Sequence, residues 1–136
     1  MREIAGMATI LAVGFAGATA AATMGKDEHK ASRARIAAEY QADRQKCGAH
    51  LGQPAELCVA RARGAQRVAR AELEAAYKPS PRTQFDAAMA RAEAAYEIAK
   101  KECGGKDGGI RNGCLKDAEA TRAAAKAAAS AARNVR

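Results

Sequence analysis

Two stretches of nineteen residues decide the fold: Tyr40–Cys58 reads YQADRQKCGAHLGQPAELC, and Tyr96–Cys114 reads YEIAKKECGGKDGGIRNGC. When the first is shifted onto the second by 56 positions, a tyrosine, two cysteines and two glycines superpose. The shared pattern is Tyr-x6-Cys-Gly-x3-Gly-x5-Cys, and its two copies contain all four cysteines of the chain. These identities in register predict that the chain is built from a duplicated unit.

Each unit has the residue pattern of a helical hairpin. In the second unit, apolar or small residues recur at steps of three and four, which places them on one face of a helix. They are Phe85, Met89, Ala92, Tyr96, Ala99 and Cys103. The first unit keeps Ile36, Tyr40 and Cys47 on the equivalent face, where Asp43 interrupts the stripe. We therefore predict an all-α fold of two duplicated helical hairpins, with alanine-rich, coiled-coil-like packing.

Helix ends are marked by glycine, proline and polar residues. Gly48 and Gly104 directly follow a cysteine and suit left-handed helix C-caps. Pro54 suits a first helical turn, and Asn112 can cap the last helix. Gly64 marks either a close approach of two helices or a tolerated defect that costs about 1 kcal/mol.

The segment between the two units is Lys78–Pro81. Pro79 ends one helix, and Ser80 and Pro81 suit the cap and first residue of the next. The predicted helices are about 26–47, 54–78, 81–103 and 112–133, in units 23–78 and 79–136. This linker permits either a compact four-helix bundle or two splayed hairpins, and thin hairpins could also bury their faces against a second copy.

Composition excludes a large core and a multidomain enzyme. Alanine supplies 39 of the 136 residues, and beyond residue 22 only sixteen are Leu, Ile, Val, Met, Phe or Tyr. The chain has three serines and two histidines, and we find no pairing of a nucleophile with a base. We therefore expect a protein that is not an enzyme and has no catalytic residues.

Residues 1–22 differ from the rest of the chain. A charged start is followed by an uncharged stretch, Ile4–Gly17, and then by small residues up to Ala22. This pattern is typical of a secretory signal peptide, since a membrane-spanning helix needs about 20 strongly apolar residues. We expect cleavage after Ala20 or Ala22, and a periplasmic product without a transmembrane span that keeps the net charge of +8.

The even number of cysteines suits an exported protein with disulfides. An antiparallel hairpin places the last turn of one helix beside the first turn of the next, which predicts the pairs Cys47–Cys58 and Cys103–Cys114. Each pair would close a twelve-residue segment, and the chain-entropy model assigns such a loop roughly 3 kcal/mol.

A metal-handling protein is the alternative. If the four helices form one bundle, Cys47, Cys58, Cys103 and Cys114 could converge and bind zinc or copper together with His50. However, ten residues separate the cysteines of each pair, whereas structural zinc sites usually have two to four. The leading prediction is therefore no metal and no cofactor.

Basic side chains form stripes on two predicted helices. One face of the second helix carries Arg63, Arg67 and Arg70. The fourth helix has a similar basic stripe, which consists of Arg122, Lys126 and Arg133. These six are candidates for anion binding, although a solvated helix face has the same pattern. Export favours envelope anions such as lipopolysaccharide, acidic lipid or peptidoglycan, or another envelope protein, and disfavours nucleic acid as the physiological partner.

The twin cysteine units, the alanine-rich helices and the central segment Ala71–Pro81, AELEAAYKPSP, together resemble a group of small exported bacterial proteins. Some members of that group are labelled TolA-like cell-envelope proteins. The resemblance implies a location in the cell envelope and contributes no catalytic residue. The function expected from all these features is a periplasmic helical scaffold or binding module.

Overall fold

The computed structural model describes residues 23–135, and this range contains four α-helices and no β-strand. They are α1 (Lys26–Cys47), α2 (Gln53–Tyr77), α3 (Pro81–Gly104) and α4 (Gly108–Asn134). The predicted all-α fold with two hairpins is confirmed, and the ends of the first three helices agree with prediction to within one residue. The expected signal peptide lies outside the described residues.

The fourth helix begins four residues earlier than predicted, at Gly108 rather than residue 112. Its N-cap is Asp107, whose carbonyl accepts a hydrogen bond of 3.1 Å from the backbone N–H of Arg111. Asn112 lies inside the helix, so its predicted role as a cap is wrong. The reason is the conformation of Gly108, whose φ of 40° turns the chain into α4 soon after α3 ends.

Glycines shape the two hairpin loops, although at different positions from those predicted. Gly48 has a φ of −64°, and Gly104 belongs to α3, so the left-handed caps expected there are wrong. The positive φ values among the described glycines are at Gly52, 65°, and Gly108, 40°. These two occupy equivalent positions in the repeat. The chain therefore leaves each first helix with right-handed geometry and uses a left-handed residue to enter the next helix.

The connection between α2 and α3 is as predicted. Ser80 caps α3, and Pro81 is its first residue. The Ser80 hydroxyl accepts a 3.1 Å hydrogen bond from the backbone N–H of Thr83, and the Thr83 hydroxyl accepts one of 3.0 Å from the backbone N–H of Ser80. This reciprocal pair satisfies two backbone donors and fixes the start of α3.

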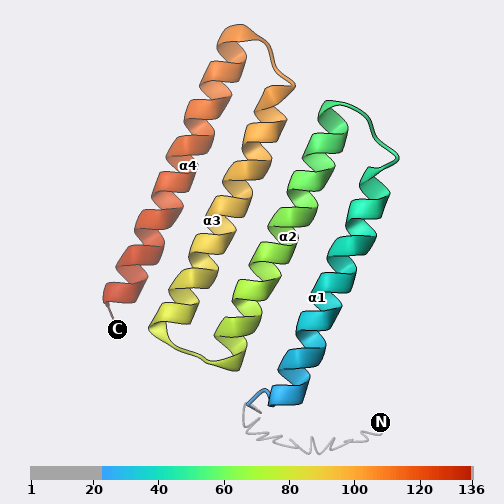
Figure 1. Ribbon diagram of the computed structural model, residues 1–136. Helices are drawn as coiled ribbons and strands as arrows, with labels where there is room; N and C mark the ends of the chain where they lie inside the picture. Colours follow the sequence, from blue (N-terminus) through green and yellow to red (C-terminus); the bar gives the residue numbers. More distant parts are fainter. Residues whose placement is uncertain (1–22, 136) are drawn as a thin grey trace, which may run out of the picture.

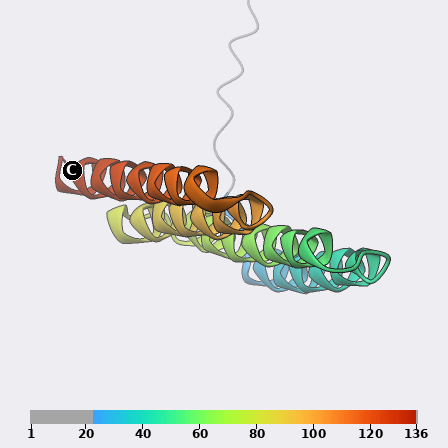
Figure 2. The same cartoon turned by 90° about the horizontal axis from the view of Figure 1, so that it is seen from above.

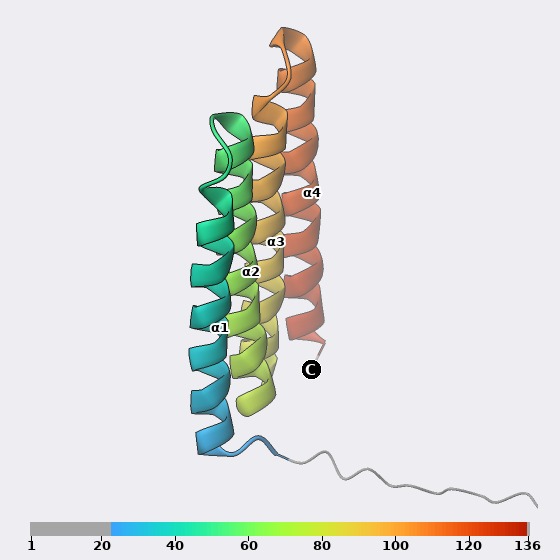
Figure 3. The same ribbon diagram turned by 90° about the vertical axis from the view of Figure 1, so that its right-hand side faces the viewer.

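The four helices form a single layer (Figure 1). Each described helix contacts only the helices that precede and follow it in the chain, so α1 and α4 lie at opposite edges. Figure 2 shows the helices following one another in a row, and Figure 3 shows the twist of that row. The arrangement is neither a compact bundle nor two splayed hairpins. A compact bundle would require α1 to meet α4, and splayed hairpins would not have α2 packed along α3.

The buried core is thin and consists mostly of alanine. Its members are Ile36, Cys47, Ala62, Leu73, Ala87, Ala90, Ala92, Ala94, Cys103 and Ala129. Gly64 of α2 faces Ala94 of α3, and a Cβ on Gly64 would lie 3.2 Å from the Ala94 Cβ. The interpretation of Gly64 as a close approach is therefore confirmed. The layer also exposes two broad faces, because a helix within it has neighbours on only two sides.

Both predicted disulfides are present. Cys47 bonds to Cys58, and Cys103 bonds to Cys114. The two bridged loops lie at the same end of the layer, opposite the connection between α2 and α3 (Figure 1). Each bridge ties the end of one helix to the start of the next, so each edge helix is held covalently to its inner neighbour.

Candidate anion-binding face

Three arginines of α2, Arg63, Arg67 and Arg70, lie on one broad face of the layer. Arg63 and Arg67 line two grooves, one beside α3 and one beside α1, and Arg70 lines the second. Because the two grooves share these side chains, they open on the same face. The structure therefore places together the three α2 candidates that the sequence identified.

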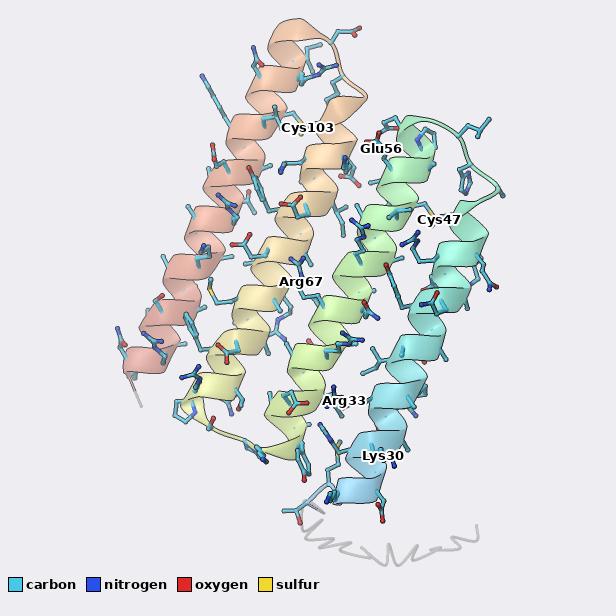
Figure 4. The ribbon with its side chains drawn as sticks, in the orientation of Figure 1. Lys30, Arg33, Cys47, Glu56, Arg67 and Cys103 are labelled. Carbon is cyan, nitrogen blue, oxygen red and sulfur yellow. A yellow bond between two sulfur atoms is a disulfide. The ribbon has the colours of Figure 1, made fainter. Side chains whose placement is uncertain are left out.

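Helix α1 adds two cations that the sequence analysis did not single out. Lys30 and Arg33 line a recess at the start of α1, and Figure 4 shows both near that end of the layer, with Arg67 further along on α2. Arg33 precedes Tyr40 by seven residues, so both lie on one face of α1, and Tyr40 lines a groove together with the three arginines of α2. We call Lys30, Arg33, Arg63, Arg67 and Arg70 the basic face.

None of the five side chains of the basic face forms an ion pair with a described carboxylate. One phenol lies among them: Arg44 and Arg63 lie beside Tyr40 and lower the pKa of its hydroxyl from the ordinary value. Carboxylates line the same recesses but are outnumbered by the cations; they are Asp27, Glu56, Glu74 and Glu97. An excess of cations creates a positive potential over the surface that attracts anions.

The candidates on α4 have a different environment. The carboxylate of Glu93 in α3 lies 3.0 Å from the Lys126 ammonium and 3.5 Å from the Arg122 guanidinium. Lys126, and to a lesser degree Arg122, lowers the pKa of Glu93. The Arg122 guanidinium also lies 3.9 Å from the centre of the Tyr96 ring. Both cations therefore hold α4 against α3, and their charge is largely compensated by Glu93 and Glu119.

The repeat explains why Lys126 has an ion pair and its equivalent in the first hairpin, Arg70, has none among the described residues. Shifting by 56 positions places Ala37 of α1 on Glu93 of α3, and Arg70 on Lys126. In the second hairpin the glutamate pairs with the lysine. In the first hairpin alanine replaces that glutamate, so Arg70 has no carboxylate at the equivalent place. The basic face is thus specific to the first hairpin.

Arg133, the sixth candidate, lies over the Phe85 ring, 4.4 Å from its centre. The equivalent pair in the first hairpin is His29 and Tyr77, whose rings stack with centres 4.1 Å apart. The sequence analysis missed these contacts. The 56-residue offset relates Phe85 to His29 and Arg133 to Tyr77, which is the signal that could have found them.

Four cations outside the basic face are paired with carboxylates. The guanidinium of Arg61 lies 2.9 Å from Glu102, and that of Arg91 lies 2.6 Å from Glu72. On α1 the pairs are Arg35 with Glu39 and Lys46 with Asp43. These four cations therefore differ from the five of the basic face, which have no ion pair with a described carboxylate.

The residues of the alternative metal site are not arranged as the metal-binding hypothesis requires. All four cysteine sulfurs are in disulfides, so thiolate ligands would first require reduction. His50 is exposed in the loop between α1 and α2. Within residues 23–135, no three His, Cys, Asp or Glu side chains are grouped as metal ligands.

Comparison with known proteins adds no relative: no protein-family model, no curated protein and no solved structure matches this chain.

Proposed function

We propose that this chain is a non-enzymatic, exported binding module that docks on a phosphate-bearing surface of the cell envelope through its basic face. The observation that carries the proposal is the group of five cations, from Lys30 to Arg70, without described carboxylate partners. The two disulfides support export, because such bonds persist in oxidising compartments.

Phosphate is the anion that best suits this face. Arginine supplies a planar fork of donors that matches phosphate oxygens in a bidentate way, and three of the five cations are arginines of α2. A flat layer also suits an extended surface better than a small enclosed ligand, because side chains from two helices can reach the same plane. No described helix is long and apolar enough to cross a membrane, so the proposed contact is peripheral.

The experiment measures co-sedimentation of the oxidised protein, expressed from residue 23, with vesicles. The vesicles contain phosphatidylglycerol or lipopolysaccharide in phosphatidylcholine, with pure phosphatidylcholine as the reference. We expect binding only to the anionic vesicles, and a decrease as salt rises, because exposed charges are screened over about 8 Å at physiological ionic strength. The triple substitution Arg63→Gln, Arg67→Gln and Arg70→Gln should reduce the bound fraction at least tenfold.

The matched control changes three cations outside the basic face, Arg35→Gln, Lys46→Gln and Arg91→Gln. Both triple variants lose the same net charge, so they separate the position of the charge from its total. Equal losses of binding in the two variants, or binding of the wild type to pure phosphatidylcholine, would refute the basic face as the docking surface.

A further inference from the structure

The groove between α2 and α3 has features that phosphate binding does not use. It is a recess of about 440 Å³ on the same broad face as the arginines, a size within the usual range of small-ligand sites. Its apolar lining consists of Ala55, Val59, Ala60, Gly64 and Ala94. The floor is low because Gly64 has no side chain at the point where α2 approaches α3.

Charges along the groove are distributed unevenly. On the α3 side and at one end, the charged groups are paired: Glu97 with Lys100 at 3.4 Å, and Glu56 with Lys101 at 2.9 Å. Lys101 lowers the pKa of Glu56, so that carboxylate stays ionised. On the α2 side, Arg63 and Arg67 line the groove without a described ion pair. An apolar floor beside two guanidinium groups that have no described ion pair is complementary to a molecule with an aliphatic chain and an anionic head.

We propose that the α2–α3 groove binds one free single-chain carboxylate amphiphile, such as a fatty acid, with its head at Arg63 and Arg67 and its chain along Val59, Ala60 and Gly64. Val59 and Arg67 lie eight positions apart on α2, which is about 12 Å along a helix. A recess of about 440 Å³ along this span suits one chain, whereas a membrane lipid would bring a second chain. This inference rests on the proposed function only because both use Arg63 and Arg67.

The test is a calorimetric titration of the oxidised protein with three probes below their micellar concentrations. Dodecanoate has the chain and the negative head, dodecyltrimethylammonium has the same chain with a positive head, and butanoate has the head with little chain. We expect one dodecanoate per protein chain, and at least tenfold weaker binding of each other probe. Equal binding of both dodecyl probes, or many dodecanoates per chain, would overturn the proposal.

Two variants on the same helix test the location. Ala60→Leu fills the groove without changing charge, and Ala76→Leu makes the same change at an exposed position on the opposite face. We expect Ala60→Leu to weaken dodecanoate binding at least tenfold and Ala76→Leu to leave it unchanged. Circular dichroism checks that both variants are helical, and Val59→Gln serves as a second groove variant if Ala60→Leu does not fold. Unchanged dodecanoate binding in the groove variant would overturn the proposal.

The same proteins separate this inference from the proposed function. Vesicle binding by the wild type without dodecanoate binding would refute the groove ligand and leave docking intact. Dodecanoate binding without vesicle binding would refute docking and support the groove. Ala60→Leu should bind anionic vesicles as well as the wild type does, because its arginines are unchanged.

Discussion

Gly64 is the residue that permits α2 and α3 to lie close together. A Cβ there would be 3.2 Å from the Cβ of Ala94 and 3.5 Å from Cδ1 of Ile98. We expect Gly64→Val to lower the free energy of unfolding by about 1–3 kcal/mol, the usual cost of overpacking a well-packed site. Urea denaturation followed by circular dichroism measures this change.

Gly113 of α4 provides the control for that substitution. It is also inside a helix, but a Cβ there would have no heavy atom within 4 Å. Gly113→Val should therefore stay within about 0.5 kcal/mol of the wild type, since valine and glycine differ little in helix propensity. Similar losses at both positions would show that the effect comes from backbone propensity and not from the contact between α2 and α3.

Glu93 is the residue whose ionisation links α3 to α4. Because Lys126 and Arg122 lower the pKa of its carboxyl in the folded state, the folded protein favours the ionised form more than the unfolded chain does. The resulting stabilisation is present above the unfolded pKa and is lost as the pH falls through the lower, folded pKa. We expect the urea midpoint of the wild type to fall as the solution is acidified below the ordinary glutamate value of 4.5.

The variant Glu93→Gln should show a smaller loss on acidification, because its amide does not titrate. Glu119→Gln is the matched control, since Glu119 approaches Arg122 only to 3.9 Å. A pH dependence for Glu93→Gln as steep as that of the control would contradict the role assigned to Glu93.

At the scale of elements, α4 depends on its disulfide more than its length suggests. It spans Gly108–Asn134, contacts α3 alone among the described helices, and has one buried residue, Ala129. Replacing Cys103 and Cys114 by serine should cost about 3 kcal/mol in the chain-entropy model. Native-state hydrogen exchange should then show faster exchange throughout α4 than in α2 and α3.

The corresponding pair of substitutions in the first hairpin, Cys47→Ser and Cys58→Ser, tests whether this effect is local. We expect faster exchange in α1 and little change in α4, because these two helices do not contact each other. Uniform acceleration over all four helices in both double variants would instead indicate one cooperative unit.

The elements themselves could be predicted well because their signals are local. Ser80 and Pro81 carry their capping information in the side chain and ring, and both were placed correctly. The left-handed caps predicted at Gly48 and Gly104 are wrong because a glycine at the end of a helix can take either sign of φ, and the choice depends on the loop that follows. That loop places the positive φ at Gly52 and Gly108.

The candidate site was predicted in part for the same reason. The helical spacing of Arg63, Arg67 and Arg70 is visible in sequence, and the structure shows them on one face. The ion pairs of Arg122 and Lys126 with Glu93 join different helices, so they depend on a register that spacing along one helix does not contain. The contribution of Lys30 and Arg33 depends on the pairing of α1 with α2 in the same way.

At the scale of the whole molecule, the sequence does not predict the open layer. Repeat and hairpin signals indicate that consecutive helices pair, but they do not indicate whether the first and last helices meet. The hairpins were expected either to fold into one bundle or to splay apart. Instead, α2 and α3 pack through Gly64, Ala94 and other small residues, while α1 and α4 remain at the edges.

Because each of the helices from α1 to α4 contacts only its neighbours among residues 23–135, the free energy of this protein should resemble a sum over adjacent pairs, as in linear repeat arrays. Such contacts close short loops, and low contact order is associated with folding in microseconds to milliseconds. Unfolding would then start at the outer helices and proceed inward, so the pair α2–α3 would persist longest. A chain organised in this way could gain or lose a terminal hairpin in evolution without rebuilding a common centre.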